Sequence, residues 1–483
     1  MLNIHALAVS VLLLGPQDSA IAQARQAGPA VDSVLSAESC ALAPDPSRST
    51  CVPASATACV VAVSAESLKV KVTDASRRAC LSVARLIEPD LPIASDDNLR
   101  AGPPGNVPLS ASADVHCRLK PRAESGGSLK FRCMRTNAQD QLYDKDGELA
   151  PDAVGFDAGG DLLDTRGEKV LDEDGEPREG DELRVKYFLG SVPAMRYREM
   201  FTETVVSRLF WALGIPVDHV YMPASVRCTG CSADPFGQKV AKRSPTPQVF
   251  TLASVEHPYD GKTIAVTRGK GFLGLGGKYD HGFGFDEIGT LLPDWPPSRR
   301  LEAEVMAIAL NLVAYSNTHA YQNDLVCRKG AWDKATGACT DVVALVADVG
   351  GTLGGERAWW VKGMPAPEMN RFPRGDFITF AYGSVFTDQT TCKLRYDIGS
   401  TRNVSEAARR IMDERIRDRL GREQLRIIFE AASIHRMETQ VNAAVGAMSS
   451  LQPGPALNRA VQLLWADEMM ERFAEILTRR CPG

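Results

Sequence analysis

The chain has 483 residues, of which 44% are hydrophobic and 24% charged, so its composition is that of a globular protein and its length allows two or three domains. The formal net charge is -5 at pH 7, with acidic and basic residues interspersed. Nucleic-acid-binding proteins concentrate Lys and Arg in a patch or stripe. This sequence has no such stripe, so we expect no nucleic-acid partner.

The first 24 residues have the pattern of a secretory signal peptide. An apolar run from Ala6 to Leu14 is followed by Gly-Pro, and Ala22 and Ala24 form an A-x-A cleavage pattern. The segment before the run contains no Lys or Arg, which departs from the usual pattern, and a short N-terminal helix is the alternative. No later segment has the ~20 apolar residues that span a bilayer. We therefore expect an exported protein without a transmembrane segment.

The cysteine content agrees with export. There are 12 cysteines, an even number, and disulfides persist mainly in oxidising compartments. Hairpins are expected to bring Cys117 to Cys133 and Cys327 to Cys339. The C-x-x-C motif at residues 228–231 has no further pair of ligands at zinc-site spacing. A disulfide or a free pair is therefore predicted there in place of a metal site.

Composition changes along the chain predict its organisation. Residues 25–115 are rich in Ala, Ser, Pro and Cys and are expected to form a small disulfide-rich N-terminal region. Residues 116–290 are strand-rich and include an acidic insertion with "DKDGEL" and "DEDGEP", which are typical hairpin turns. Calcium loops are not expected, because the EF-hand Gly and Glu positions do not match. Residues 291–483 are predicted to be mostly helical.

The clearest local pattern begins near residue 183. "ELRVKYF" alternates as a strand, and the next segment places Phe201, Val205, Leu209 and Leu213 at helical spacing, with Gly214 as a stop signal. Three further short strands follow. Together these patterns predict a sheet with one helix packed against it.

A glycine-rich segment at residues 267–285 resembles a phosphate-binding loop only superficially. A Walker A loop requires Ser or Thr after its Lys, whereas Tyr279 follows Lys278. A dinucleotide fingerprint requires a helix directly after the glycines, and here more Gly and Asp follow. We therefore expect a flexible loop without a phosphate-binding role.

Three charged residues are candidates for a chemical site. Lys186 lies in the predicted strand, and Glu203 lies 17 residues later in the predicted helix. A strand lysine held by a helical carboxylate can contact nucleotide phosphates. Asp348 follows a buried apolar strand and precedes glycines, which suits a magnesium ligand. The alternatives are solvated charges for the first two and a turn-forming residue for Asp348.

Six segments resemble, in this order, a family of secreted bacterial proteins: "RVKYF", "ETVVSRLFWALGIPVDHVYMPASVRCTGC", "GFGFDEI", "AYSNTHAYQNDLVC", "VADVGGTLG" and "EQLRIIFEAAS". That family in turn resembles a remote branch of the atypical kinase superfamily, alongside HipA-type, CotH-type and secretory-pathway kinases. The resemblance implies an α+β, bilobal kinase-like fold, with a strand-rich N-lobe and a helical C-lobe after the small N-terminal region. It also implies a bacterial protein located in the periplasm or outside the cell.

The resemblance also implies roles for individual residues. Lys186 would contact the phosphates of ATP or another nucleotide, Glu203 would be its ion-pair partner, and Asp348 would bind Mg²⁺. The segment 282–288, with Phe285 and Glu287, would form the hinge beside the adenine.

The loop "AYSNTHAYQNDLVC" departs from the family, whose loops read like "HSDNKPEQQRLVC". Aligned on "LVC", Asn317 takes the place of the catalytic aspartate, His319 that of the lysine, and Gln322 that of the metal-binding amide. A shift by one residue makes Asn323 the metal ligand and places Thr318 at the acid position. Neither register supplies an acid.

The missing acid leaves two hypotheses. An Asn can orient a hydroxyl group but cannot accept its proton, and loss of a general base slows a reaction by roughly 10²–10⁴-fold. His319 is a substitute base in the first hypothesis, which is weak or altered phosphoryl or nucleotidyl transfer to an unknown protein or small-molecule acceptor. The second hypothesis is an inactive pseudokinase that acts as a binding module, because ATP is scarce outside the cytoplasm.

Overall fold

The computed structural model of the chain describes residues 59–60, 69–72, 74–88, 96–103, 113–122, 124, 128–173, 175–188, 198–242, 246–266, 282–315, 322–333, 337–350, 352–353, 385–388, 391–398, 401–431, 469–476, 478 and 481. All of them belong to one compact unit, Val52–Gly483. The predicted signal peptide and most of the glycine-rich segment lie outside the described residues.

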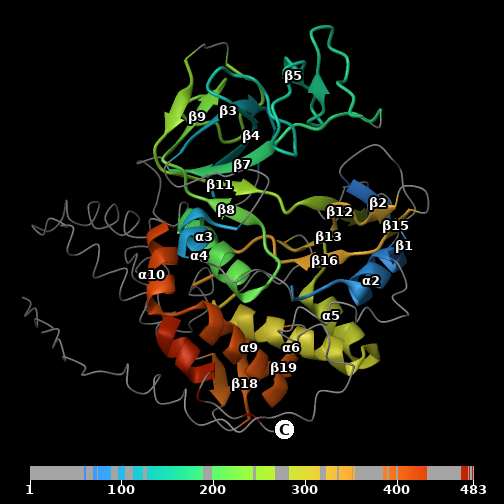
Figure 1. The fold of residues 1–483 in the computed structure, drawn as a ribbon, viewed down its shortest axis with the longest axis vertical. Coiled ribbons are helices and arrows are strands. Elements are labelled where there is room, and N and C mark those ends of the chain that lie inside the picture. Colours follow the sequence, from blue (N-terminus) through green and yellow to red (C-terminus); the bar gives the residue numbers. More distant parts are fainter. Residues whose placement is uncertain are drawn as a thin grey trace, which may run out of the picture. The chain divides into compact units, whose positions relative to one another are not determined.

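A seven-stranded mixed sheet is the largest sheet of this α+β structure (Figure 1). Its order is β10-β9-β3-β4-β7-β11-β8, and all neighbours are antiparallel except β3 and β9. The strands span Asp114–Lys120 (β3), Lys130–Thr136 (β4), Glu182–Tyr187 (β7), His219–Tyr221 (β8), Ser225–Thr229 (β9), Gln248–Phe250 (β10) and Ala253–His257 (β11).

The two faces of this sheet differ in character because side chains alternate along each strand. In β7, Leu183 and Val185 are buried in a hydrophobic cluster with Phe131 of β4. Arg184 and Lys186 alternate with them and lie on the opposite, polar face. The predicted alternation of "ELRVKYF" is confirmed, and it gives the sheet one apolar and one charged face.

Helix α4, Arg198–Leu213, packs against β8 and β11. Its predicted apolar positions, Phe201, Val205, Leu209 and Leu213, are all buried. The helix ends at the predicted stop, where Gly214 has φ +74°, a left-handed conformation that glycine adopts without strain. The predicted arrangement of a strand followed by a packed helix is therefore confirmed.

A four-stranded sheet joins segments that are far apart in the sequence. Its order is β16-β13-β12-β2, with strands Lys69–Val72 (β2), Gly261–Val266 (β12), Asp324–Arg328 (β13) and Val342–Leu345 (β16). A smaller sheet pairs Cys59–Val60 (β1) with Ala338–Cys339 (β15), which also pairs with Trp332–Asp333 (β14). The sequence pattern predicted that the last of the three short strands after α4, which is β12, joins the sheet of β7. In the structure β12 belongs to the four-stranded sheet instead.

The described elements of residues 59–103 belong to the same compact unit as the later described residues. Strand β2 runs parallel to β12, and helix α2, Asp74–Val83, contacts β12 and β16. Helix α3, Asp96–Ala101, packs on α10. Described elements before residue 115 therefore pair and pack with elements from later parts of the sequence. The strands among them are too short to bury an apolar face by themselves, so they pair with later ones.

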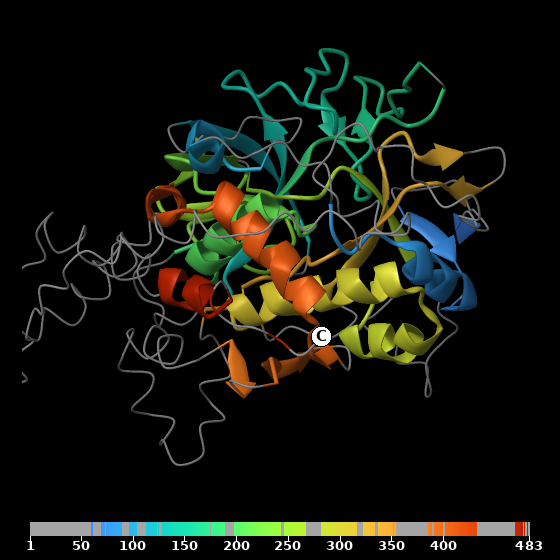
Figure 2. The ribbon, with the colours of Figure 1, turned by 60° about the horizontal axis from the view of Figure 1, so that its bottom comes forward.

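The C-terminal part contains helices and strands. The helices span Phe285–Leu291 (α5), Pro297–Leu312 (α6), Glu406–Arg419 (α9) and Arg422–Ala431 (α10), with a 3₁₀ turn at Leu292–Asp294 (η6). Helix α9 crosses α6 (Figure 2). A three-stranded sheet follows α6 in the sequence, with strands Phe386–Asp388 (β17), Lys393–Ile398 (β18) and Thr401–Asn403 (β19). The prediction of a mostly helical half missed these strands, which are too short for a clear alternation.

The acidic insertion forms hairpin turns, as predicted. Gly147 and Gly175 have φ values of +82° and +76°, and each backbone N–H donates to the carbonyl of the Asp three residues earlier. In the first turn, Asp144 Oδ1 also accepts hydrogen bonds from the backbone of Glu148, at 2.8 Å. The short strands Gly155–Phe156 (β5) and Leu162–Leu163 (β6) lie between these turns.

The predicted disulfides Cys117–Cys133 and Cys327–Cys339 are present, and the C-x-x-C motif at 228–231 is also a disulfide. Two further disulfides, Cys59–Cys80 and Cys392–Cys481, were not predicted. Among the described residues no cysteine is unpaired. None of the described helices has the length and apolar character needed to cross a membrane.

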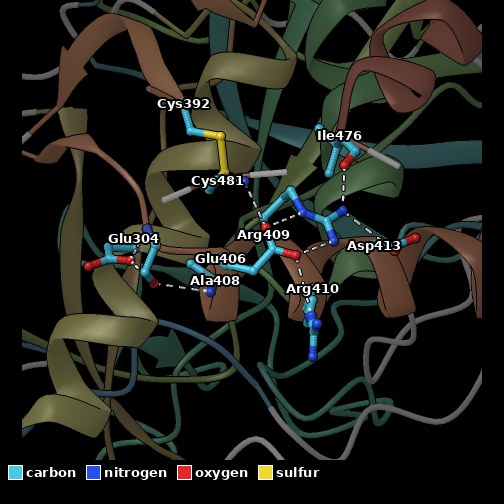
Figure 3. The surroundings of a disulfide bond; sticks show 10 residues. Glu304, Cys392, Glu406, Ala408, Arg409, Arg410, Asp413, Ile476 and Cys481 are labelled. Carbon is cyan, nitrogen blue, oxygen red and sulfur yellow. Dashed lines mark hydrogen bonds and ion pairs between the residues drawn. A yellow bond between two sulfur atoms is a disulfide. The ribbon is translucent and has the colours of Figure 1, made fainter. Parts of the chain in front are cut away.

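The disulfide Cys392–Cys481 anchors the C-terminal segment beside α9 (Figure 3). Glu406 accepts hydrogen bonds from Nε of Arg409 at 2.9 Å and from the backbone N–H of Cys481 at 2.8 Å. Arg409 also donates to the carbonyl of Ile476 at 2.6 Å. Glu406 and Arg409 therefore link α9 to the C-terminal segment at Cys481 and Ile476, respectively.

This linkage predicts acid sensitivity. The hydrogen bond from Arg409 is the main cause that lowers the pKa of Glu406 to about 2. Because the folded-state pKa lies below the unfolded value, the stabilisation is present above about pH 4.5 and is lost as pH falls towards 2. We expect Glu406→Gln to lower the melting temperature by about 1–2 °C at pH 7 and by less at pH 3. Glu168→Gln, at an exposed turn, is the control, and a pH-independent difference for Glu406→Gln would contradict the linkage.

Candidate functional site

Lys186 projects from the polar face of the central sheet. It is 5% exposed and lies in β7 opposite Ser254 of β11 and Lys130 of β4. Its position follows from the alternation of β7, which buries Val185 and Tyr187 on the other face. A lysine is rarely this buried unless it is paired, so its partners decide whether the arrangement is stable.

Helix α4 supplies the partners of Lys186. The ammonium group forms an ion pair with Glu203, whose side chain is 3% exposed, and lies 3.5 Å from Oε2 of Glu199. Glu199 and Glu203 are four residues apart, so they share one face of the helix. The predicted pairing of Lys186 with Glu203 is present in the structure, and Glu199 adds a second carboxylate that sequence reasoning missed. Its i−4 spacing from Glu203 was the available signal.

Several nearby carboxylates shift the pKa values of Lys186 and Glu203. Burial by itself lowers the pKa of Lys186, but the negative charges of Glu203 and Glu199 outweigh it and raise that pKa above its ordinary value. Burial raises the pKa of Glu203, and the nearby carboxylates of Glu256 and Asp348 add to this against the attraction of Lys186. The carboxylates around Lys186 therefore favour its protonated form, while their mutual repulsion disfavours the charged form of Glu203.

Asp348 lies next to the ion pair because its loop is attached to α4. The carbonyl of Gly350 accepts a hydrogen bond from the hydroxyl of Thr202 on α4 at 3.0 Å. A Cβ atom at Gly350 would lie 2.8 Å from Oε1 of Glu203 and 3.0 Å from Cγ of Glu199. Only glycine lets the loop approach this closely. The first glycine of "DVGG", Gly350, therefore brings Asp348 and the carboxylates of α4 together.

The predicted metal-binding amides lie on the segment that leads to β13. The backbone N–H of Asp348 donates to the carbonyl of Gln322 at 3.0 Å, so Gln322 borders the Asp348 loop. Asn323 is completely buried, and its Oδ1 accepts a hydrogen bond from the hydroxyl of Tyr315 at 2.9 Å. Of the two, Gln322 lies nearer the surface, while the amide oxygen of Asn323 already has a partner inside the protein.

The two residues expected at the adenine have other contacts. Phe285 is buried, with its ring edge-on to Tyr315 at 6.0 Å between centroids. Glu287 accepts a hydrogen bond from the backbone N–H of Gly284 at 3.0 Å and forms an ion pair with Arg77. Both residues therefore hold the start of α5, and Phe285 connects to the Asp348 region through Tyr315 and Asn323.

The proposed catalytic positions Asn317 and His319, and Thr318 of the other register, lie outside the described residues. The described residues on either side place this segment between α6 and β13, with Tyr315 and Asn323 hydrogen-bonded to each other across it. The ends of the loop are therefore held close to Asp348, as the predicted order of helix, loop and strand requires.

A cavity of about 300 Å³ lies near the other end of α4. Trp211, His219 and Tyr259 are among its lining residues, and none of the predicted site residues lines it. Burial lowers the pKa of His219 to about 3, so this imidazole is neutral near pH 7. The predicted site is thus supported by side-chain contacts and not by this cavity.

Replacement of Gly350 by Ala tests the packing of the loop on α4. The added Cβ would collide with Glu203, which is held by Lys186, so we expect a loss of stability of about 1–3 kcal/mol in urea unfolding. Gly155→Ala is the matched control, because a Cβ there meets nothing within 4 Å. Equal stability of Gly350→Ala and the wild type would show that the loop is not packed in this way.

Comparisons with known proteins give limited information. No protein-family model matches the chain, and no curated protein matches it. Among solved structures, a Helicobacter pylori proinflammatory kinase, CtkA, is similar over 76% of this chain and 97% of its own, with 10% identity and a TM-score of 0.35. HipA of Shewanella oneidensis, from a toxin–antitoxin complex with HipB and operator DNA, is similar over 74% of this chain and 68% of its own, with 14% identity and a TM-score of 0.24. These structural neighbours are kinase-like proteins at low TM-score and low identity.

Proposed function

We propose that the protein is an exported, bilobal kinase-like protein that binds a nucleotide together with Mg²⁺ in front of the Lys186–Glu203 pair. The observation that carries this proposal is the convergence of Lys186, Glu203 and the Asp348 loop, which come from distant parts of the sequence. A buried lysine held by a helical carboxylate, beside an aspartate before glycines, suits phosphate and metal binding.

The donor set fits a hard divalent cation. Mg²⁺ prefers oxygen ligands and is usually held by one or two carboxylates plus phosphate oxygens and water. Asp348 offers a carboxylate, and Gln322 offers an amide oxygen on the adjoining segment. A cation bound by Asp348 would relieve the repulsion that this carboxylate and its neighbours exert on Glu203. When bound, Mg²⁺ would neutralise charge on the phosphate oxygens.

The candidate site residues have distinct roles in this proposal. Lys186 would donate hydrogen bonds to phosphate oxygens, and Glu203 would keep its ammonium group in position. Asn317 would orient an acceptor hydroxyl without accepting its proton, so transfer would be slow. Phosphoryl transfer depends largely on positioning and electrostatics, and the acceptor, a protein or a small molecule, would then be phosphorylated or nucleotidylated weakly.

A pseudokinase that only binds its ligand or partner is the alternative. It is favoured by the lack of an acid at the catalytic position in either register and by the buried Asn323, whose amide oxygen is already hydrogen-bonded to Tyr315. In that case the disulfides would serve a stable binding module outside the cytoplasm. Binding and turnover therefore need separate tests.

Binding is tested by thermal unfolding of the oxidised mature protein. We expect Mg²⁺-ATP at about 100 times its Kd to stabilise the fold by about 2.7 kcal/mol, and hence to raise the melting temperature. Asp348→Ala should abolish the shift, and EDTA should reduce it. Asp152→Ala, an exposed carboxylate in the acidic insertion, is the control. A wild-type protein that shows no shift at any ATP concentration would exclude the proposed nucleotide site.

Turnover is tested by restoring the missing acid. With radiolabelled ATP, we expect Asn317→Asp to increase label transfer by roughly 10²-fold or more, because an aspartate accepts the proton of the attacking hydroxyl. If Thr318→Asp gains transfer and Asn317→Asp does not, the second register is correct. If neither variant transfers label while ATP still binds, the pseudokinase alternative is favoured.

A further inference from the structure

Lys130 is a second lysine on the polar face of the central sheet. It lies in β4 directly opposite Lys186 of β7. Directly opposed residues of an antiparallel pair have Cβ atoms roughly 4.5–5.5 Å apart on the same face. Lys130 is half-buried, whereas Lys186 is 5% exposed. The two ammonium groups therefore border the same region in front of α4, and that of Lys130 is the more accessible.

The other basic side chains of this face are paired with carboxylates. Lys120 and Arg132 both bind Glu182, each at 2.5 Å. Arg184, in the same cross-strand row as Arg132, forms an ion pair with Glu256. Lys186 is held by Glu203 and Glu199. Each of these four cations thus has at least one carboxylate partner, from the sheet or from α4.

Lys130 breaks this pattern, since it has no ion pair or hydrogen bond with any residue in the described part of the chain. Burial lowers its pKa, and repulsion from Lys186 and Arg184 lowers it further. Like charges directly opposite each other in a sheet are destabilising. An unpaired lysine held beside a paired one is therefore an unfavourable arrangement in the free protein, and an anion placed between them would relieve it.

We propose that Lys130 is a second phosphate-binding residue, which together with Lys186 selects ligands that carry a chain of phosphate groups over nucleoside monophosphates. This inference rests on the proposed nucleotide function and names its ligand class as nucleoside di- and triphosphates. Two ammonium groups on adjacent strands suit an anion with neighbouring charged groups, because each can donate charge-assisted hydrogen bonds to a different phosphate. A monophosphate offers fewer acceptor oxygens and less negative charge to the two lysines than a di- or triphosphate does.

The experiment compares the affinities of the wild type and Lys130→Met for Mg²⁺-ATP, Mg²⁺-ADP, AMP and inorganic tripolyphosphate by isothermal titration calorimetry. Met preserves the length of the apolar stem and removes the charge. We expect Lys130→Met to lose about 10-fold or more in affinity for ATP and tripolyphosphate, which corresponds to one charge-assisted hydrogen bond. The same substitution should change the affinity for AMP by less than about 2-fold.

Two variants control for general effects of charge and packing. Lys130→Arg keeps the positive charge and should retain most of the ATP affinity. Lys145→Met removes one positive charge from the exposed acidic insertion and should leave all four affinities unchanged. In the absence of ligand, Lys130→Met should also melt about 1–3 °C higher than the wild type, because it removes the repulsion from Lys186.

The outcomes separate this inference from the proposed function. If the wild type binds ATP and Lys130→Met binds it equally well, Lys130 is not a phosphate ligand, while the nucleotide site stands. An equal loss of ATP and AMP affinity would overturn the selective role of Lys130. If the wild type binds tripolyphosphate through Lys130 but no nucleotide, the polyanion contact stands and the nucleotide function fails. Absence of binding to all four probes removes both.

Discussion

The structure around the candidate site depends on one interaction, the buried ion pair between Lys186 and Glu203. Two charges removed from water must each find a partner, and deletion of one partner of such a pair typically destabilises a protein by about 3–5 kcal/mol. The pair therefore requires β7 and α4 to be held in one relative position. The packing of α4 against β8 and β11 provides this position, and the apolar residues of α4 stabilise it. Gly350 then allows the Asp348 loop to approach the same carboxylates.

The C-terminal end of α4 is held by hydrogen bonds from arginine side chains of α9. Arg415 of α9 donates to the carbonyl of Leu213, and Arg419 donates to that of Ala212 at 3.0 Å. Cations near the last carbonyl groups of a helix satisfy unpaired acceptors and complement its dipole. Arg415 also donates to the carbonyl of Glu88 at 3.3 Å, which ties the N-terminal region to the same point. Helix α9 and the segment at Glu88 thus hold the end of the helix that carries the carboxylates of the site.

The polar face of the sheet gives the site its electrostatic character. Lys120, Arg132 and Arg184 are neutralised by carboxylates of the sheet itself, so they stabilise the face without offering charge to a ligand. The carboxylates near Lys186 and the unpaired Lys130 leave charges of both signs available at one place. The proposed complex of Mg²⁺ with a polyphosphate would present charges of both signs to this place.

The sequence by itself determined the local elements whose patterns are long and regular. The alternation of β7 and the helical spacing of α4 predicted both the strand of Lys186 and the helix of Glu203, and hairpin spacing predicted Cys117–Cys133 and Cys327–Cys339. Only the tertiary structure decided the pairing of β2 with β12 and of β1 with β15. These strands have two to six residues, which is too short for their sequence pattern to indicate a distant pairing partner. The tertiary structure also decided that Glu199 and Lys130 flank Lys186, since cross-strand register and helix packing bring residues together that sequence separation keeps apart.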